Sequence, residues 1–166
     1  MLLVGNPGLS ISEQRAQFAL WAILAAPLYI STDLRTISSE SLEILSNREV
    51  IGINQDALGK QGYVVFEDEH RRVWIKPLSN ARTAVLFENK RTIFNEIRFK
   101  FDPDLVLGWD NNGTYSVRDV HRHIDVVTNR PCQESFTVDV DESCVELFIF
   151  THHRSEPELS IVLEFQ

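Results

Sequence analysis

The sequence predicts two fold classes in succession: an α/β segment and then an all-β antiparallel sandwich. The first observation is the run of residues 19–28, which is apolar on nearly every face and so requires burial on all sides. The second is the order strand, helix, strand, helix within the first fifty residues. The third is a change to a period of two from Gly62 onward. We therefore place a domain boundary between residues 61 and 62, with 1–61 as an incomplete α/β piece and 62–166 as the sandwich.

The first strand and helix are expected within residues 1–27. Residues 1–4 are apolar, like the end of a buried strand, and a loop rich in Gly and Pro follows. Ser10 and Glu13 have the spacing of a capping box, which predicts a helix that begins near Ile11. Pro27 should end that helix, because proline disfavours the helical conformation of the residue before it.

A second strand and helix are expected within residues 28–47. Residues 28–31 form a short apolar strand, and Ser38 can cap a helix that runs to about Ser46, with Asn47 as its C-cap. A βαβα unit needs a parallel sheet and cannot close one alone. The unit therefore predicts a larger α/β body.

The sandwich should contain about eight strands joined by polar turns. We expect residues 62–166 to close their own core. The predicted strands are 63–66, 72–78, 83–88, 96–101, 115–120, 136–140, 144–150 and 158–165.

Composition excludes some classes of function. The 166 residues carry a net charge of −8 and contain no basic stripe, which argues against nucleic-acid binding. No apolar run reaches the length of a transmembrane helix, and the N-terminus lacks the basic region of a signal peptide.

The two cysteines, Cys132 and Cys144, are too few for a disulfide scaffold. If strands 136–140 and 144–150 form a hairpin with its turn at 141–143, Cys132 faces a position near His152. That register favours two free thiols. A disulfide through a bent loop is the alternative.

Few residues could carry chemistry. Asp33 follows a strand of the barrel type, and barrel enzymes keep their catalytic groups at the C-terminal ends of such strands. The nearby Arg35, however, favours a structural ion pair with Asp33. His121 and His123 could share one face of a strand and bind a metal, yet no second cluster completes a site. A solvated strand or loop is the interpretation we favour, so we predict no metal and no cofactor.

Two tryptophans and one sequon are further candidates for contact with a sugar or for modification. Trp74 lies in mid-strand, where core packing is expected, whereas Trp109 lies in a loop and could stack on a sugar ring. Asn112, in the sequence Asn-Gly-Thr, is a candidate N-glycosylation site if the chain enters the secretory path.

The first 63 residues also resemble a known family at matching spacing. They are similar to the last barrel segment of the animal α-galactosidases and α-N-acetylgalactosaminidases, glycoside hydrolase family 27. Beyond residue 63 the similarity continues only as a pattern of strands. The matching stretches are residues 1–6, 8–10, 20–28, 31–35 and 53–56.

The resemblance implies the C-terminal piece of a (β/α)₈ barrel followed by a β-sandwich. The intact enzyme would remove terminal α-linked galactose or N-acetylgalactosamine with retention, without metal or cofactor. Its two catalytic aspartates lie on earlier strands, so no catalytic residue is expected here, and a third acid would immediately precede Met1. Only Met1 matches a position that lines the sugar pocket.

The resemblance further implies a lysosomal or secreted enzyme that is a homodimer when full length, with a glycan as its substrate. By itself this chain is expected to be inactive. The alternative is a non-catalytic β-sandwich module that binds glycans or packs on a partner. Such a module, however, has no use for an incomplete barrel. A third interpretation is an incomplete gene product without a function of its own.

Overall fold

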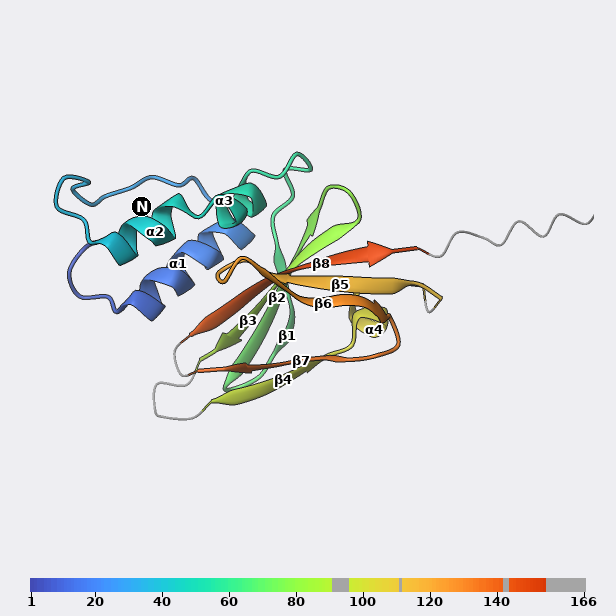
Figure 1. Cartoon of the computed structure of the whole chain (residues 1–166). Coiled ribbons are helices and arrows are strands. Elements are labelled where there is room, and N and C mark those ends of the chain that lie inside the picture. Colours follow the sequence, from blue (N-terminus) through green and yellow to red (C-terminus); the bar gives the residue numbers. More distant parts are fainter. Residues whose placement is uncertain (91–95, 111, 142–143, 155–166) are drawn as a thin grey trace, which may run out of the picture.

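The computed structural model describes residues 1–90, 96–110, 112–141 and 144–154. They form three layers: a group of helices, a six-stranded antiparallel sheet, and a two-stranded sheet with one short helix (Figure 1). The elements are α1 (Ile11–Ile23), α2 (Ser39–Ser46), α3 (Arg48–Asn54), β1 (Tyr63–Glu67), β2 (Arg71–Leu78), β3 (Arg82–Asn89), β4 (Ile97–Phe101), α4 (Pro103–Leu107), β5 (Thr114–Asp119), β6 (Ile124–Pro131), β7 (Phe136–Val140) and β8 (Val145–His153). Among the described residues, no helix has the length and apolar composition needed to cross a bilayer.

The helices begin where the sequence predicts. Ser10 accepts a hydrogen bond from the Glu13 amide, and the Glu13 carboxylate bonds back to the Ser10 amide, so the capping box is confirmed. Ser38 caps α2, because its side-chain oxygen accepts a hydrogen bond from the Ser41 amide at 3.2 Å. Asn47 ends α2 but also caps α3, because its side-chain oxygen accepts from the Glu49 and Val50 amides. The sequence analysis did not predict α3.

The two strands predicted before and after α1 are reduced to one parallel bridge, between Leu2 and Ile30. The Leu2 amide donates to the Tyr29 carbonyl at 2.8 Å, and the Ser31 amide donates to the Leu2 carbonyl at 3.3 Å. Parallel pairing is weak per residue and normally lies inside a wider sheet. No further strand flanks this pair among the described residues, which explains why the strands are so short.

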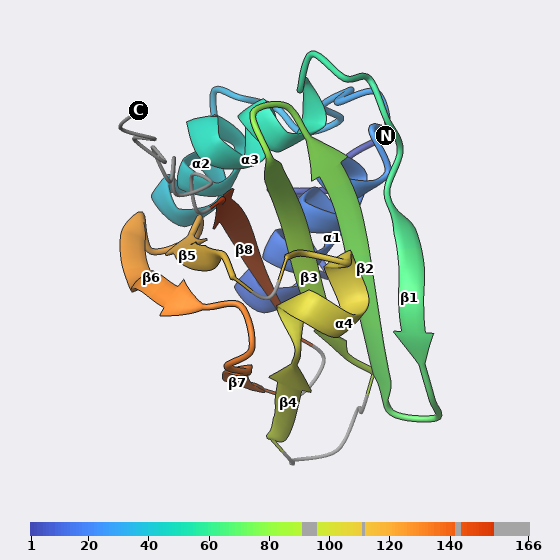
Figure 2. The same cartoon turned by 90° about the vertical axis from the view of Figure 1, so that its right-hand side faces the viewer.

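The six-stranded sheet has the order β1-β2-β3-β8-β5-β6, with β1 and β6 at its edges (Figure 2). Its two faces contribute to two separate cores, because side chains alternate along each strand. On β3, Ala84 and Leu86 face the helices, whereas Val85 and Phe87 face β4 and β7. The predicted strands of the sandwich are confirmed from 63 to 150, with small shifts at their ends. The predicted strand 158–165 lies outside the described residues.

The predicted hairpin between strands 136–140 and 144–150 is wrong. β7 pairs with β4 in the small sheet, whereas β8 lies between β3 and β5. The reason is that β8 is apolar on both faces: Leu147 faces the helices and Phe148 the aromatic core. A strand of this kind is stable only in the middle of a sheet. The sequence analysis also missed β6 and α4.

Both cysteines are free thiols, with Cys132 buried and Cys144 half-buried. The preference for free thiols is therefore confirmed, although the hairpin on which its register argument depended does not form. The pKa of the Cys132 thiol is raised by burial and by the nearby carboxylates of Asp104 and Asp110.

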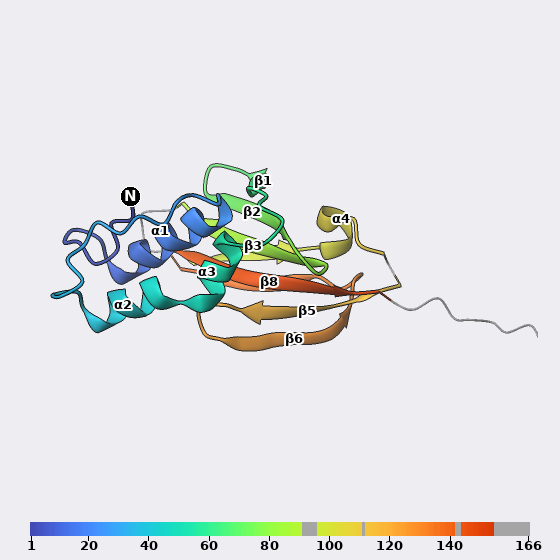
Figure 3. The ribbon, with the colours of Figure 1, turned by 90° about the horizontal axis from the view of Figure 1, so that it is seen from above.

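Residues 62–166 close one core of their own, between the large sheet and the strands β4 and β7, but the other face of the large sheet is covered by the helices. α1 covers the face of the sheet formed by β2, β3 and β8 (Figure 3), and one apolar cluster contains residues of both parts. Phe18 and Ala22 of α1 are buried together with Leu86 and Leu147 of the sheet. The sheet thus needs a cover on each face, and the helices supply one of the two covers.

Candidate functional site

The bridge between residues 2 and 30 creates an exposed apolar surface, which we call the strand-pair face: Met1, Leu3, Tyr29, Ile30 and Leu34. Leu2 and Val4 point into the core, so the alternating Met1 and Leu3 point outward. Met1 is 70% exposed and Tyr29 is 69% exposed. Parallel strands are usually buried on both faces, so this surface has the composition of an interior.

Gln14 holds the loop that follows the first strand. It is buried, and its side-chain oxygen accepts from the Gly5 amide at 2.9 Å and from the Ser41 hydroxyl at 2.7 Å. Its amide nitrogen donates to the Leu9 carbonyl at 3.0 Å. Neighbouring Gln17 accepts from the Leu3 amide at 2.8 Å. These bonds fix the position of the strand that carries Met1.

Asp33 forms the predicted ion pair. Its two carboxylate oxygens accept from Arg35 at 2.9 Å (Nε) and 2.7 Å (Nη2), and the Arg35 amide also donates to it. These bonds lower the pKa of Asp33 below its usual value. The only other acid in the first 36 residues, Glu13, is held by Ser10. This segment therefore contains no pair of free carboxylates of the kind that glycoside hydrolysis requires.

The structure separates the two histidines of the candidate metal cluster. His121 lies against α1 and α2, whereas the His123 ring bonds to Glu49 of α3, with 2.7 Å between Nδ1 and Oε1. The described residues contain no group of three or more His, Cys, Asp or Glu side chains able to hold a metal.

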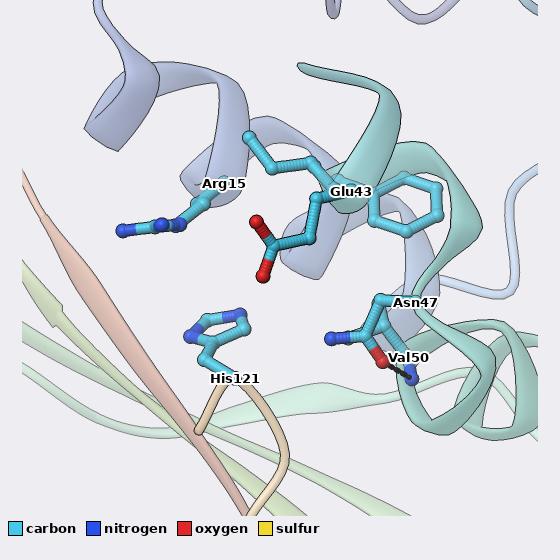
Figure 4. Close-up of a pocket in the computed structure, with 7 residues that line it drawn as sticks. Arg15, Glu43, Asn47, Val50 and His121 are labelled. Atoms are coloured by element: carbon cyan, nitrogen blue, oxygen red, sulfur yellow. Dashed lines mark hydrogen bonds between the residues drawn. The ribbon is translucent and has the colours of Figure 1, made fainter. Parts of the chain in front are cut away.

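His121 lines a small cleft between the helices and the loop after β5. Figure 4 shows the Glu43 carboxylate between Arg15 and His121, with Asn47 beside them. The cleft has a volume of about 20 Å³, room for roughly one water molecule. Burial lowers the pKa of His121 to about 4, with Asp119 opposing this shift and Arg15 contributing to it. His121 is therefore neutral at pH 7.

A second cavity of about 220 Å³ adjoins this cleft and shares Arg15 and His121 with it. It also contains Cys144 and Glu146, and burial raises the pKa of the Glu146 carboxyl. Its charges are mixed, because Arg122 lies 3.2 Å from Asp119 and 3.7 Å from Glu146.

Neither Trp74 nor Trp109 has both faces of its ring free to stack on a sugar. The Trp109 ring stacks on His152, with centroids 4.8 Å apart and planes 7° apart. The Arg72 guanidinium lies 5.5 Å from the centroid of Trp74, and the Trp74 indole donates to Glu88 at 2.9 Å. The packing role expected for Trp74 agrees with these contacts. Sugar stacking on Trp109 stays a prediction.

Asn112 is exposed in the turn before β5, and its backbone amide donates to the Asp110 carboxylate at 3.1 Å. Gly113, the middle residue of the sequon, is tightly packed, because a Cβ there would lie 2.5 Å from His152 Nε2. The side chain of Asn112 is thus accessible, and its glycosylation stays a prediction.

The sequence analysis missed an ion-pair network between α3 and the sheet. Arg118 of β5 donates to both oxygens of Glu49 at 2.8 Å and to Asp125 of β6 at 3.1 Å. Lys76 was missed as well. It is buried, and its ammonium donates to the carbonyls of Ala22 at 2.9 Å and Asn54 at 3.4 Å. A single charged residue within an alternating strand pattern does not show whether it forms an ion pair or is buried. Neither role could therefore be predicted from the sequence.

Comparison with known proteins identifies both parts of the chain. A family model for alpha galactosidase A matches residues 1–56, and a model for the alpha galactosidase C-terminal beta sandwich domain matches residues 68–149. An alpha-N-acetylgalactosaminidase of Gallus gallus is 41% identical over 150 residues, which is 89% of this chain and 36% of that protein. Alpha-galactosidase A of Homo sapiens is 50% identical over 93 residues, 56% of this chain and 22% of that protein.

A solved structure agrees with the sequence matches. Alpha-galactosidase I from Mortierella vinacea superposes with a TM-score of 0.80 at 26% identity, over 93% of this chain and 40% of that one. The chain therefore spans roughly a third of the length of the relatives that it matches over most of its own length.

Proposed function

This chain belongs to the α-galactosidase and α-N-acetylgalactosaminidase family, glycoside hydrolase family 27, and on that premise we propose that it forms the end of such a hydrolase. Residues 1–61 supply the last segment of the (β/α)₈ barrel, and residues 62–166 supply the C-terminal sandwich. The complete enzyme releases terminal α-linked galactose or N-acetylgalactosamine from glycolipids or glycoproteins, with retention of configuration.

The strand-pair face is the observation that carries this proposal. Met1, Leu3 and Tyr29 are exposed although they belong to a parallel strand pair, which normally lies between neighbouring strands and helices. The rest of a barrel would cover this face. Barrel enzymes build their sites at the C-terminal ends of the strands, so Met1 would lie beside the bound sugar as a contact residue.

The chain itself would not carry the catalytic pair. Retention requires two carboxyl groups about 5 Å apart, one as nucleophile and one as acid and base. Asp33 and Glu13 are both held by neighbouring side chains, which supports placing the pair in other parts of the enzyme. No step of the proposed mechanism requires a metal or a cofactor.

The remaining proposals follow from the family. The complete enzyme would be lysosomal or secreted, would form a homodimer, and would carry a glycan on the exposed side chain of Asn112. The loop between α3 and β1 would join the two domains.

The first test is an assay of the purified chain on p-nitrophenyl α-galactoside and its N-acetylgalactosaminide analogue. We expect no turnover of either compound. Turnover that is lost in Asp33→Asn would contradict the proposal and make Asp33 a catalytic residue.

A positive test is a chimera in which this chain replaces the matching segment of the Gallus gallus relative. We expect the chimera to hydrolyse the N-acetylgalactosaminide, and Met1→Lys in the chimera to raise KM at least tenfold. The matched control, Leu105→Lys on exposed α4, should leave KM unchanged. A folded chimera without activity would contradict the proposed role.

A further inference from the structure

At the parallel bridge, the Leu2 carbonyl receives its shortest hydrogen bond from a side chain, the hydroxyl of Ser31. The Ser31 hydroxyl donates to this carbonyl at 2.6 Å, whereas the Ser31 backbone amide lies 3.3 Å from it. Backbone amides usually donate over about 2.7–3.2 Å, so the amide bond is a long one. The Leu2 carbonyl is therefore held mainly by the hydroxyl.

Asn6 fixes the direction in which this hydroxyl donates. The side-chain nitrogen of Asn6 donates to the Ser31 oxygen at 2.8 Å. A serine hydroxyl has a single proton, and an amide nitrogen can only donate. Because the Ser31 oxygen accepts from Asn6, its own proton must go to the Leu2 carbonyl. The three groups form a chain of hydrogen bonds with one direction, from Asn6 through Ser31 to Leu2.

The loop after the first strand brings Asn6 to this position. Gly5 has a φ of +84°, which glycine adopts without strain, and a Cβ there would lie 2.9 Å from the Ile37 side chain. The Asn6 backbone amide donates to the Leu3 carbonyl at 2.9 Å, which closes the turn. Asn6 and Ser31 are both half-buried, so water competes less for their mutual bond.

The bonds of Leu2 set the direction in which Met1 projects. The Leu2 side chain is buried in the core, and the Leu2 amide donates to the Tyr29 carbonyl at 2.8 Å. Ser31 holds the carbonyl of the same residue. With its side chain and both of its backbone groups held, Leu2 leaves the preceding residue, Met1, little freedom to turn about the strand axis.

We propose that Ser31 is the positioning residue for Met1 in the complete hydrolase, and that Asn6 sets the direction of its hydroxyl. The inference rests on the proposed function, in which Met1 contacts the sugar. Ser31 acts through Met1 and does not itself touch the sugar. Loss of its bond should weaken binding of the ground state and of the transition state equally, which raises KM and leaves kcat unchanged.

Kinetics of the chimera with the Gallus gallus relative test this role. Ser31→Ala should raise KM for the N-acetylgalactosaminide at least fivefold and change kcat less than twofold, and Ser31→Thr, which keeps the hydroxyl, should restore KM. The matched control is Ser46→Ala, which removes a hydroxyl that donates to the Leu42 carbonyl at the end of α2. It should change neither constant.

The two proposals fail in different ways. An inactive chimera without further substitutions would contradict the proposed function. An active chimera in which Ser31→Ala leaves KM unchanged, or lowers kcat and KM together, would overturn the positioning role of Ser31.

A double-mutant cycle separates positioning of Met1 from a general loss of stability. Ser31→Ala added to Met1→Ala should raise KM less than twofold further, because the group that Ser31 positions is already gone. A fivefold rise in both backgrounds would show that Ser31 does not act through Met1 and would overturn the proposal.

The substitution Asn6→Asp tests the direction of the hydroxyl. It keeps the size of the side chain but replaces the donor by an acceptor, so the Ser31 proton turns away from the Leu2 carbonyl. We expect Asn6→Asp to raise KM as much as Ser31→Ala does, within a factor of two. An unchanged KM in this variant would overturn the proposal.

Hydrogen exchange in the chain itself provides a measurement that does not depend on hydrolysis. The Leu2 amide belongs to the same bridge, so Ser31→Ala and Asn6→Asp should each speed its exchange at least fivefold. Ser46→Ala should leave that rate unchanged. Equal rates in all variants would overturn the proposal, whether or not the chimera is active.

Discussion

At the scale of single residues, the helical part of the chain and its contact with the sheet contain several buried polar groups, and most of them have partners. Lys76 donates to two carbonyls, and Gln14 bonds to Gly5, Leu9 and Ser41. His121 differs, because burial disfavours its charged form and Arg15 adds repulsion. Stability should therefore depend on pH through this residue.

We expect His121→Gln to reduce the loss of stability in acid. The pKa of His121 is about 4 in the folded chain and about 6.5 in the unfolded chain. The unfolded state thus binds more protons between these values, so histidine lowers the free energy of unfolding as pH falls from about 6.5 to about 4. His121→Gln should remove roughly 2 kcal/mol of the loss between pH 7 and pH 4.5, as measured by urea unfolding.

His70→Gln is the control, because His70 lies in the exposed turn between β1 and β2. An equal acid sensitivity in His121→Gln and the unsubstituted chain would show that His121 is not responsible for the loss.

At the scale of elements, the link between the helices and the sheet is fixed at Gly62, just before β1. The Gly62 amide donates to the carbonyl of Ile23, the last residue of α1, at 2.8 Å. A Cβ at Gly62 would lie 2.9 Å from the carbonyl oxygens of both Ile23 and Ile75. Close approach of three backbone segments therefore requires glycine at this position.

Gly62→Ala should lower the free energy of unfolding by about 1–3 kcal/mol, because backbone atoms must move apart. Gly52→Ala is the matched substitution on α3, where a Cβ meets open space. It should raise the free energy of unfolding by about 0.5–1 kcal/mol, through the higher helix propensity of alanine. Denaturant unfolding of both variants checks the pair, and a neutral Gly62→Ala would contradict the packing described here.

At the scale of the whole molecule, the helices and the sheet form one body with two cores. One core joins Phe18 and Ala22 to Leu86 and Leu147, and the other is the aromatic core of the sandwich, in which Phe87 contacts four further phenylalanine rings. The strand-pair face lies outside both cores. An exposed apolar patch of this kind favours association.

The purified chain should therefore associate through the strand-pair face. Leu3→Lys combined with Tyr29→Lys should raise the dissociation constant of the association at least tenfold, because lysine opposes burial of the patch. Sedimentation velocity measures this shift toward the monomer. Leu105→Lys, on exposed α4, is the control. A chain that is monomeric at every concentration would show that the face does not drive association.

The sequence by itself determined the local features of this protein. Ser10 with Glu13, Ser38, and the alternating pattern of strands such as 83–88 identified helix starts and strands, since caps and periodicity depend on neighbouring residues. The stretches at residues 1–6, 20–28 and 53–56 also identified the family. Met1 and Asn112 were singled out from sequence alone, and their roles stay predictions.

Only the tertiary structure decided which strands pair and what covers the sheet. β8 lies between β3 and β5 instead of pairing with β7, and α1 covers one face of the large sheet. The partners of Glu49 and Lys76 are 22 to 74 residues away in sequence, and His121 lies beside Glu43 and Arg15, which are 78 and 106 residues away. Periodicity tells which side of an element is apolar. The partner of that side depends on how distant segments bury their surfaces together, and a local pattern cannot contain that information.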